Sequence, residues 1–107
     1  MATKGFNTEP TGYKKTAISD LQGSWVSLRD SVVEKFGFPG SDKLLFHIDE
    51  AMSWESVRDL RKMEGTLLLV QNIATQTETP KEVVEHIEEV RICLRDVFDA
   101  IAEGQAQ

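Results

Sequence analysis

Residues 79–104 decide the fold class, and they read TPKEVVEHIEEVRICLRDVFDAIAEG. A helix start is predicted by Thr79 as N-cap, Pro80 at the first helical position and Glu82 completing a capping box. Gly104 marks the end of that helix. Between these signals, apolar residues recur at intervals of 4, 3, 4, 3 and 4: Val83, Ile87, Val90, Leu94, Val97 and Ile101. This is the spacing of one helix face, so the stretch predicts a long amphipathic helix.

The apolar face of this helix is too wide for a two-stranded coiled coil. Valine occupies the d position of its heptads, where parallel zippers favour leucine. Val84 and Phe98 widen the stripe on one side and Cys93 widens it on the other. A helix with such a face packs on both sides, as the helices of a bundle do.

Three further helices are predicted upstream. The first covers about residues 18–36 and is stopped by the glycines and the proline of residues 37–40. A short second helix follows, from residue 41 or 42 to about residue 51. Ser53 offers the N-cap of a third helix that extends to about residue 75. Because the connections are short, the sequence predicts an all-α fold: an antiparallel helical bundle of three long helices plus one short.

One segment of the third helix has an alternative interpretation. Residues 66–70 read TLLLV, a run that is also typical of a buried strand. A single strand among helices would lack a partner for its backbone hydrogen bonds, so helix is favoured and strand is kept as the alternative.

The beginning of the chain differs in composition from the rest. Residues 1–17 are rich in glycine, threonine and lysine, and Phe6 and Tyr13 are their only large apolar side chains. Such a segment buries too little to offset its ordering entropy. We expect a flexible tail over residues 1–17, able to order on a partner, followed by one domain over residues 18–104.

The chain is acidic, with a formal net charge of -6. The excess lies in the second half, where Lys and Arg number six against thirteen Asp and Glu from residue 44 onward. Such a surface repels phosphate backbones, so we do not expect nucleic acid as a partner. The lone Cys93 excludes an internal disulfide, and neither a secretion signal nor a membrane-length apolar run is present in the sequence. We expect a cytoplasmic protein without membrane contact.

Few residues are candidates for catalysis or metal binding. His47 and His86 have carboxylates nearby in their own segments, but the sequence lacks the two Glu-x-x-His sets that di-iron bundles use. Cys93 lies on the shoulder of the apolar stripe, where a free cysteine acts as a small hydrophobic residue. We therefore predict no catalytic residue, no cofactor, no metal ligand and no enzyme activity. The alternative is a small-molecule or metal-binding bundle that uses His47 or His86 in its interior.

Two nucleic-acid hypotheses remain as weaker alternatives. Residues 44–63 can be read as a helix-turn-helix with its turn at Met52 and Ser53, followed by a basic trio of Arg58, Arg61 and Lys62. The acidic residues of the last helix can be read as a mimic of phosphates: Glu85, Glu88, Glu89, Asp96, Asp99 and Glu103. Solvated helix surfaces with interleaved charges explain both patterns more simply.

Some apolar residues lie outside the stripes that one bundle buries. They are Trp54, Leu68, Leu69, Ile73 and Ile92, and we take them as the candidate interface. Because apolar residues on two helix faces imply burial on two sides, we expect a protein partner, most simply a second copy in a homodimer. The sequence thus predicts a self-associating protein–protein interaction module that acts as an adaptor, regulator or inhibitor.

Overall fold

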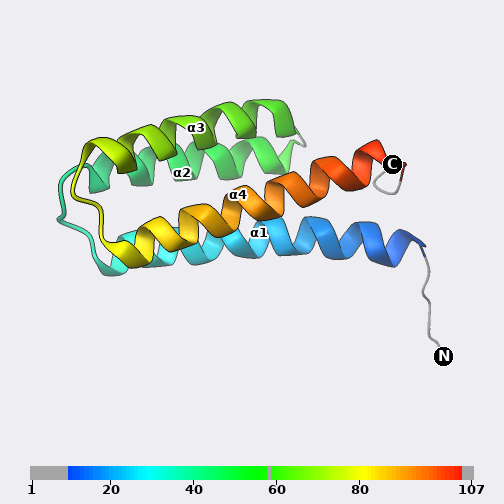
Figure 1. Ribbon diagram of the computed structural model, residues 1–107, viewed down its shortest axis with the longest axis horizontal. Helices are drawn as coiled ribbons and strands as arrows, with labels where there is room; N and C mark the ends of the chain where they lie inside the picture. Colours follow the sequence, from blue (N-terminus) through cyan, green and yellow to red (C-terminus); the bar gives the residue numbers. More distant parts are fainter. Residues whose placement is uncertain (1–9, 58, 105–107) are drawn as a thin grey trace.

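The protein is described by a computed structural model, which covers the backbone of residues 10–57 and 59–104 and the side chains of residues 17–55, 57 and 59–104. These residues form four helices: α1 (Pro10–Glu34), α2 (Ser41–Ser56), α3 (Leu60–Gln76) and α4 (Lys81–Ala102). Successive helices run in opposite directions (Figure 1). The predicted antiparallel helical bundle is confirmed, and no strand occurs within the described ranges.

A single cluster of buried side chains runs through the bundle. Its largest member is Trp25, whose indole N–H donates a hydrogen bond to the Met63 sulfur at 3.2 Å. The cluster contains residues from all four helices, including Leu21, Leu28, Val32, Leu44, Ile48, Leu67 and Val70, and, from the predicted stripe of α4, Val83, Ile87, Val90, Leu94 and Val97. Ile101 ends the predicted stripe of α4 but is 37% exposed. The core therefore stops before α4 does.

The four helices do not contact one another equally. α1 packs mainly against α4 and α2 mainly against α3, whereas α3 and α4 have the least contact of the neighbouring pairs. α1 and α4 also extend past α2 and α3 at the end where α1 begins and α4 ends (Figure 1). The side of the bundle between α3 and α4 is consequently the least closed.

The first helix begins at Pro10, well before the predicted start at about residue 18. Proline is well suited to the first turn of a helix, where its missing N–H costs no hydrogen bond. Apolar spacing reveals only the helical turns that pack on a core, and residues 10–17 contain no such stripe. The tail was predicted over residues 1–17, and residues 1–9 of it lie outside the described residues.

The boundary between α2 and α3 was predicted wrongly. α2 continues to Ser56 and has 16 residues, close to the 17 of α3, so it is not a short helix. The hydroxyl of Ser53 donates to the carbonyl of Glu50 at 2.7 Å and does not cap a new helix. The N-cap of α3 is Asp59, whose carboxylate accepts the N–H of Lys62 at 3.2 Å. With no turn at Met52 and Ser53, and with α2 and α3 side by side, the helix-turn-helix interpretation also fails.

The capping box predicted for α4 does not form. The helix begins one residue later than expected, with Pro80 as N-cap and no side-chain cap. The Thr79 hydroxyl instead lies 2.9 Å from the Thr77 hydroxyl. The Glu82 carboxylate binds the ammonium of Lys35, the residue that follows α1, at 2.6 Å, and this hydrogen bond lowers the pKa of Glu82. A tertiary ion pair has replaced the local contact that the sequence suggested.

Candidate functional site

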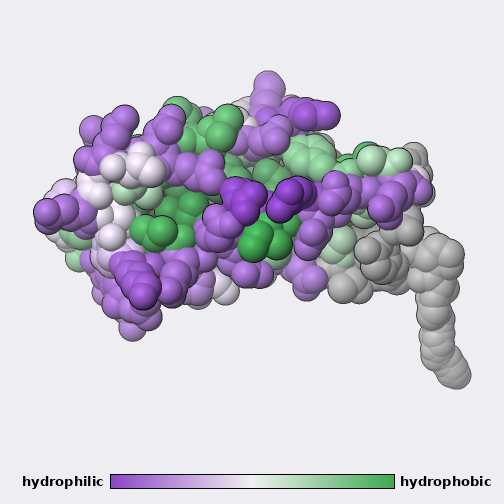
Figure 2. All heavy atoms as spheres, viewed as in Figure 1, coloured by the Kyte–Doolittle hydropathy of each residue, from purple (hydrophilic) through white to green (hydrophobic). Residues whose placement is uncertain are grey.

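An open groove of about 740 Å³ lies between α3 and α4. Its apolar lining consists of Leu67, Leu68, Leu94, Phe98, Ile101 and Ala102. In the view of Figure 2, hydrophobic atoms are exposed among strongly hydrophilic ones on the face that α3 and α4 present. The groove exists because α3 and α4 contact each other so little.

The groove has a buried floor and exposed walls. Leu67 and Leu94 are each 3% exposed and belong to the core. Leu68, by contrast, is 57% exposed, and Ile101 is also exposed. Water therefore contacts a contiguous apolar surface at this site, and covering that surface would be favourable.

Arginines border this groove although the chain is acidic. Three of the five arginines of the sequence line it: Arg61, Arg91 and Arg95. The guanidinium of Arg61 lies 4.9 Å from the centre of the Phe98 ring, a cation–π contact across α3 and α4. Arg91 donates from Nε to the Glu88 carboxylate at 3.1 Å, and this hydrogen bond lowers the pKa of Glu88.

Arg95 and Asp99 behave differently from the other charged residues at the groove. They are one turn apart on α4, a spacing that often gives an ion pair. Among the described residues, however, neither of the two side chains makes an ion pair or hydrogen bond. Within the described part of the chain, the charges of Arg95 and Asp99 are therefore unpaired.

The seam between α4 and α1 is closed by small side chains. Cys93, Ala100 and Ser24 are all buried there. Burial raises the pKa of the Cys93 thiol; a hydrogen bond with Ser24 opposes this shift, and the carboxylate of Glu89 adds to it. Because the nucleophile is the thiolate, a raised pKa makes this thiol poorly reactive at neutral pH.

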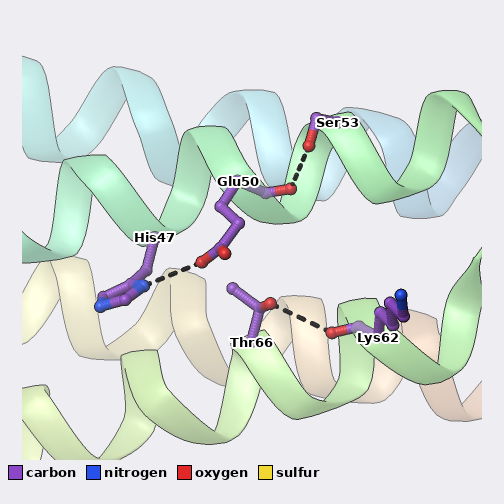
Figure 3. Close-up of polar contacts among 5 residues, drawn as sticks. All are labelled: His47, Glu50, Ser53, Lys62 and Thr66. Atoms are coloured by element: carbon purple, nitrogen blue, oxygen red, sulfur yellow. Dashed lines mark hydrogen bonds and ion pairs between the residues drawn. The ribbon is translucent and has the colours of Figure 1, made fainter.

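The outer seam between α2 and α3 carries polar contacts (Figure 3). His47 lies on α2 with its Nδ1 atom 3.0 Å from Glu50, and the Thr66 hydroxyl donates to the Lys62 carbonyl at 3.0 Å on α3. Each interaction drawn joins residues of the same helix. The side chain of His47 is 23% exposed, and this histidine is not a member of the buried core cluster.

His86 lies outside the core as well. It is half-buried at an outer groove between α1 and α4, beside Glu89 and Asp96. In the part of the chain that the structure describes, no group of three or more His, Cys, Asp and Glu side chains is arranged to hold a metal ion.

The candidate interface residues lie on separate surfaces. Leu68 lines the groove between α3 and α4, whereas Ile92 lines the outer groove between α1 and α4. Trp54 is half-buried with the Lys62 ammonium 4.8 Å from its ring centre, and Ile73 is half-buried beside the turn that precedes α2. Leu69 is 46% exposed. The structure thus does not bring the five together.

Sequence reasoning missed two residues of the groove. Phe98 and Ile101 were assigned to the packed face of the last helix, yet they line its open side. Periodicity reports which side of a helix is apolar and not how far its neighbour extends, so the sequence held no signal for this difference.

Comparison of the chain with models of known protein families, with curated proteins and with solved structures gave no match. None of the helices in the described residues is long and apolar enough to cross a membrane.

Proposed function

We propose that this chain is a protein–protein interaction module that associates with a second copy of itself through the groove between α3 and α4. The observation that supports the proposal is an apolar wall above a buried floor, in which Leu68 and Ile101 are exposed and Phe98 is half-buried. Removing apolar surface from water contributes about 25 cal/mol per Å². A second copy that covers this wall would complete the side of the bundle where α3 and α4 contact each other least.

The shape of the groove favours a helix as its occupant. Its lining on α3 covers residues 61–71, which corresponds to about 15 Å of helix, or roughly three turns. Pockets for small molecules enclose most of their ligand, whereas this groove is open along its length. An amphipathic helix can place one apolar face in such a groove and its polar flanks beside the arginines.

The proposed activity is binding and not catalysis. Such a module acts as an adaptor, regulator or inhibitor by presenting its own helical surface to a partner or by covering a surface of that partner. The proposal includes a cytoplasmic setting, where a lone thiol such as Cys93 remains reduced.

Analytical ultracentrifugation at two protein concentrations tests the proposal with the variant Leu68→Glu. We expect the wild-type chain to dimerise and Leu68→Glu to be monomeric with unchanged helical circular dichroism, because the new carboxylate would lose its hydration at the interface. The matched control is Val26→Glu, since Val26 is 46% exposed on α1 and does not line the groove. A wild-type chain that stays monomeric, or equal weakening by both variants, would contradict the proposal.

A further inference from the structure

The outer side of the second half of α4 carries a short repeating pattern. Ile92, Arg95, Asp99 and Ala102 follow one another at intervals of 3, 4 and 3, and all four are exposed. Residues at this spacing share one face of a helix. Along the helix, the stripe consists of an apolar residue, a cation, an anion and an apolar residue. When two such stripes run antiparallel, each cation faces an anion and each apolar residue faces an apolar residue.

We propose that in the dimer α4 packs antiparallel against α4 of a second copy, with Arg95 opposite the partner's Asp99. This inference rests on the proposed function. The two-fold axis lies midway between Arg95 and Asp99, so each ion pair forms twice. The same register sets Ile92 opposite the partner's Ala102, and this apolar contact also occurs twice. An isologous interface requires this kind of self-complementary surface.

The state of the two charges in the single chain supports this pairing. Arg95 and Asp99 are exposed and form no ion pair with any residue that the structure describes. The positively charged residue precedes the negatively charged one, which is the weaker order for a pair within one helix. In an antiparallel dimer each group instead meets an opposite charge across the interface.

The stripe is also continuous with the proposed interface. Arg95, Asp99 and Ala102 line the same groove as Leu68 and Phe98. A second copy placed along this edge of α4 therefore covers the apolar wall and the two charges together. It also covers Ile92, which is 38% exposed and lies beyond the groove on the other side of the stripe.

The opposite orientation is disfavoured by the same charges. In a parallel two-fold arrangement, Arg95 would lie opposite the partner's Arg95 and Asp99 opposite the partner's Asp99. Like charges facing each other at an interface are repulsive, and the chain already carries a net charge of -6. The charge pattern thus selects the antiparallel orientation.

Charge reversal tests the pairing directly. In the Arg95→Glu homodimer two glutamates face two aspartates, and in the Asp99→Arg homodimer all four facing groups are arginines. We expect each variant alone to raise the dimer Kd by at least about tenfold. An equimolar mixture of the two variants, and the double variant Arg95→Glu/Asp99→Arg, should both dimerise as the wild type does. Lys43→Glu, an exposed site on α2 with the same change in charge as Arg95→Glu, is the control and should leave the Kd unchanged.

The outcomes separate this pairing from the proposed function. If the wild type dimerises and Leu68→Glu is monomeric, but the single reversals leave the Kd unchanged, the pairing is wrong and the groove interface stands. If the single reversals weaken the dimer and the mixture does not recover it, the antiparallel register is wrong. A wild-type chain that is monomeric overturns both. Helical circular dichroism of every variant should match the wild type, because the two positions are exposed.

Discussion

Helix α4 meets its two neighbours in different ways. Against α1 it places small and medium side chains, such as Cys93, Val97 and Ala100, and all three are buried. Against α3 it leaves an open groove lined by the aromatic ring of Phe98 and by Ile101. α1 has 25 residues and α3 has 17, against 22 in α4, so only α1 is long enough to cover α4 completely. A helix that extends beyond its neighbour keeps part of its apolar face in contact with water.

The largest expected effect on stability comes from comparing a leucine in the closed core of the bundle with a leucine at the open groove. Leu21→Ala should destabilise the fold by about 3 kcal/mol, because it removes a fully buried side chain of α1 and leaves a cavity. Leu68→Ala should change the stability of the single chain by no more than about 0.5 kcal/mol, because Leu68 is mostly in water. Urea unfolding of both variants at a concentration below dimerisation measures the difference. Equal losses would mean that the groove is as closed as the core.

A second prediction concerns the packing at the C-terminal end of α3, which is distant from the groove. Gly40 has φ +86, and a Cβ at this residue would lie 3.2 Å from a methyl group of Thr77 and 3.3 Å from one of Ile73. Gly40→Ala should therefore cost about 1–3 kcal/mol. Gly65→Ala is the matched control, since a Cβ there meets nothing within 4 Å, and it should stabilise the helix by about 0.5–1 kcal/mol. Thermal unfolding of both variants gives the comparison. If Gly40→Ala does not change the stability, the side chains of Thr77 and Ile73 can move to accommodate the new methyl group.

The smallest effect concerns the closed seam and its dependence on pH. Burial raises the pKa of Cys93 in the folded state above the value in the unfolded chain, which is about 8.5. The stability gained from the protonated thiol is fully present below that pH and is lost as pH rises through the folded-state pKa. Wild type should therefore lose more stability between neutral and alkaline pH than Cys93→Ala does. Parallel urea titrations of the two proteins would show this, and identical pH profiles would mean that the thiol is not shielded.

The sequence predicted the helices better than their ends. The stripe from Val83 to Val97 appears in the core as predicted, because its spacing follows from helix geometry. The start of α3 was misplaced because serine and aspartate are both good N-caps, and nothing local favours Asp59 over Ser53. The capping box expected for α4 failed for another reason, since Glu82 pairs with Lys35, which is distant in sequence and follows the end of α1.

For the candidate site, the sequence predicted which apolar residues are exposed but not how they are arranged. Leu68, Leu69 and Ile92 are exposed, in keeping with their positions off the apolar stripes. Their distribution over separate surfaces depends on which helices are neighbours and how far each extends. Those properties come from the packing of the whole bundle, and no window of sequence contains them.

The buried contact between Trp25 and Met63 gives the protein an optical reporter of its own. The indole of Trp25 is 1% exposed and joins α1 to α3. Unfolding would transfer this indole into water and move its emission to longer wavelengths. Trp54 is only half-buried beside Lys62, so replacing it with phenylalanine would leave a fluorescence signal from the core alone. The opening of the bundle can then be followed in dilute solution without an attached dye.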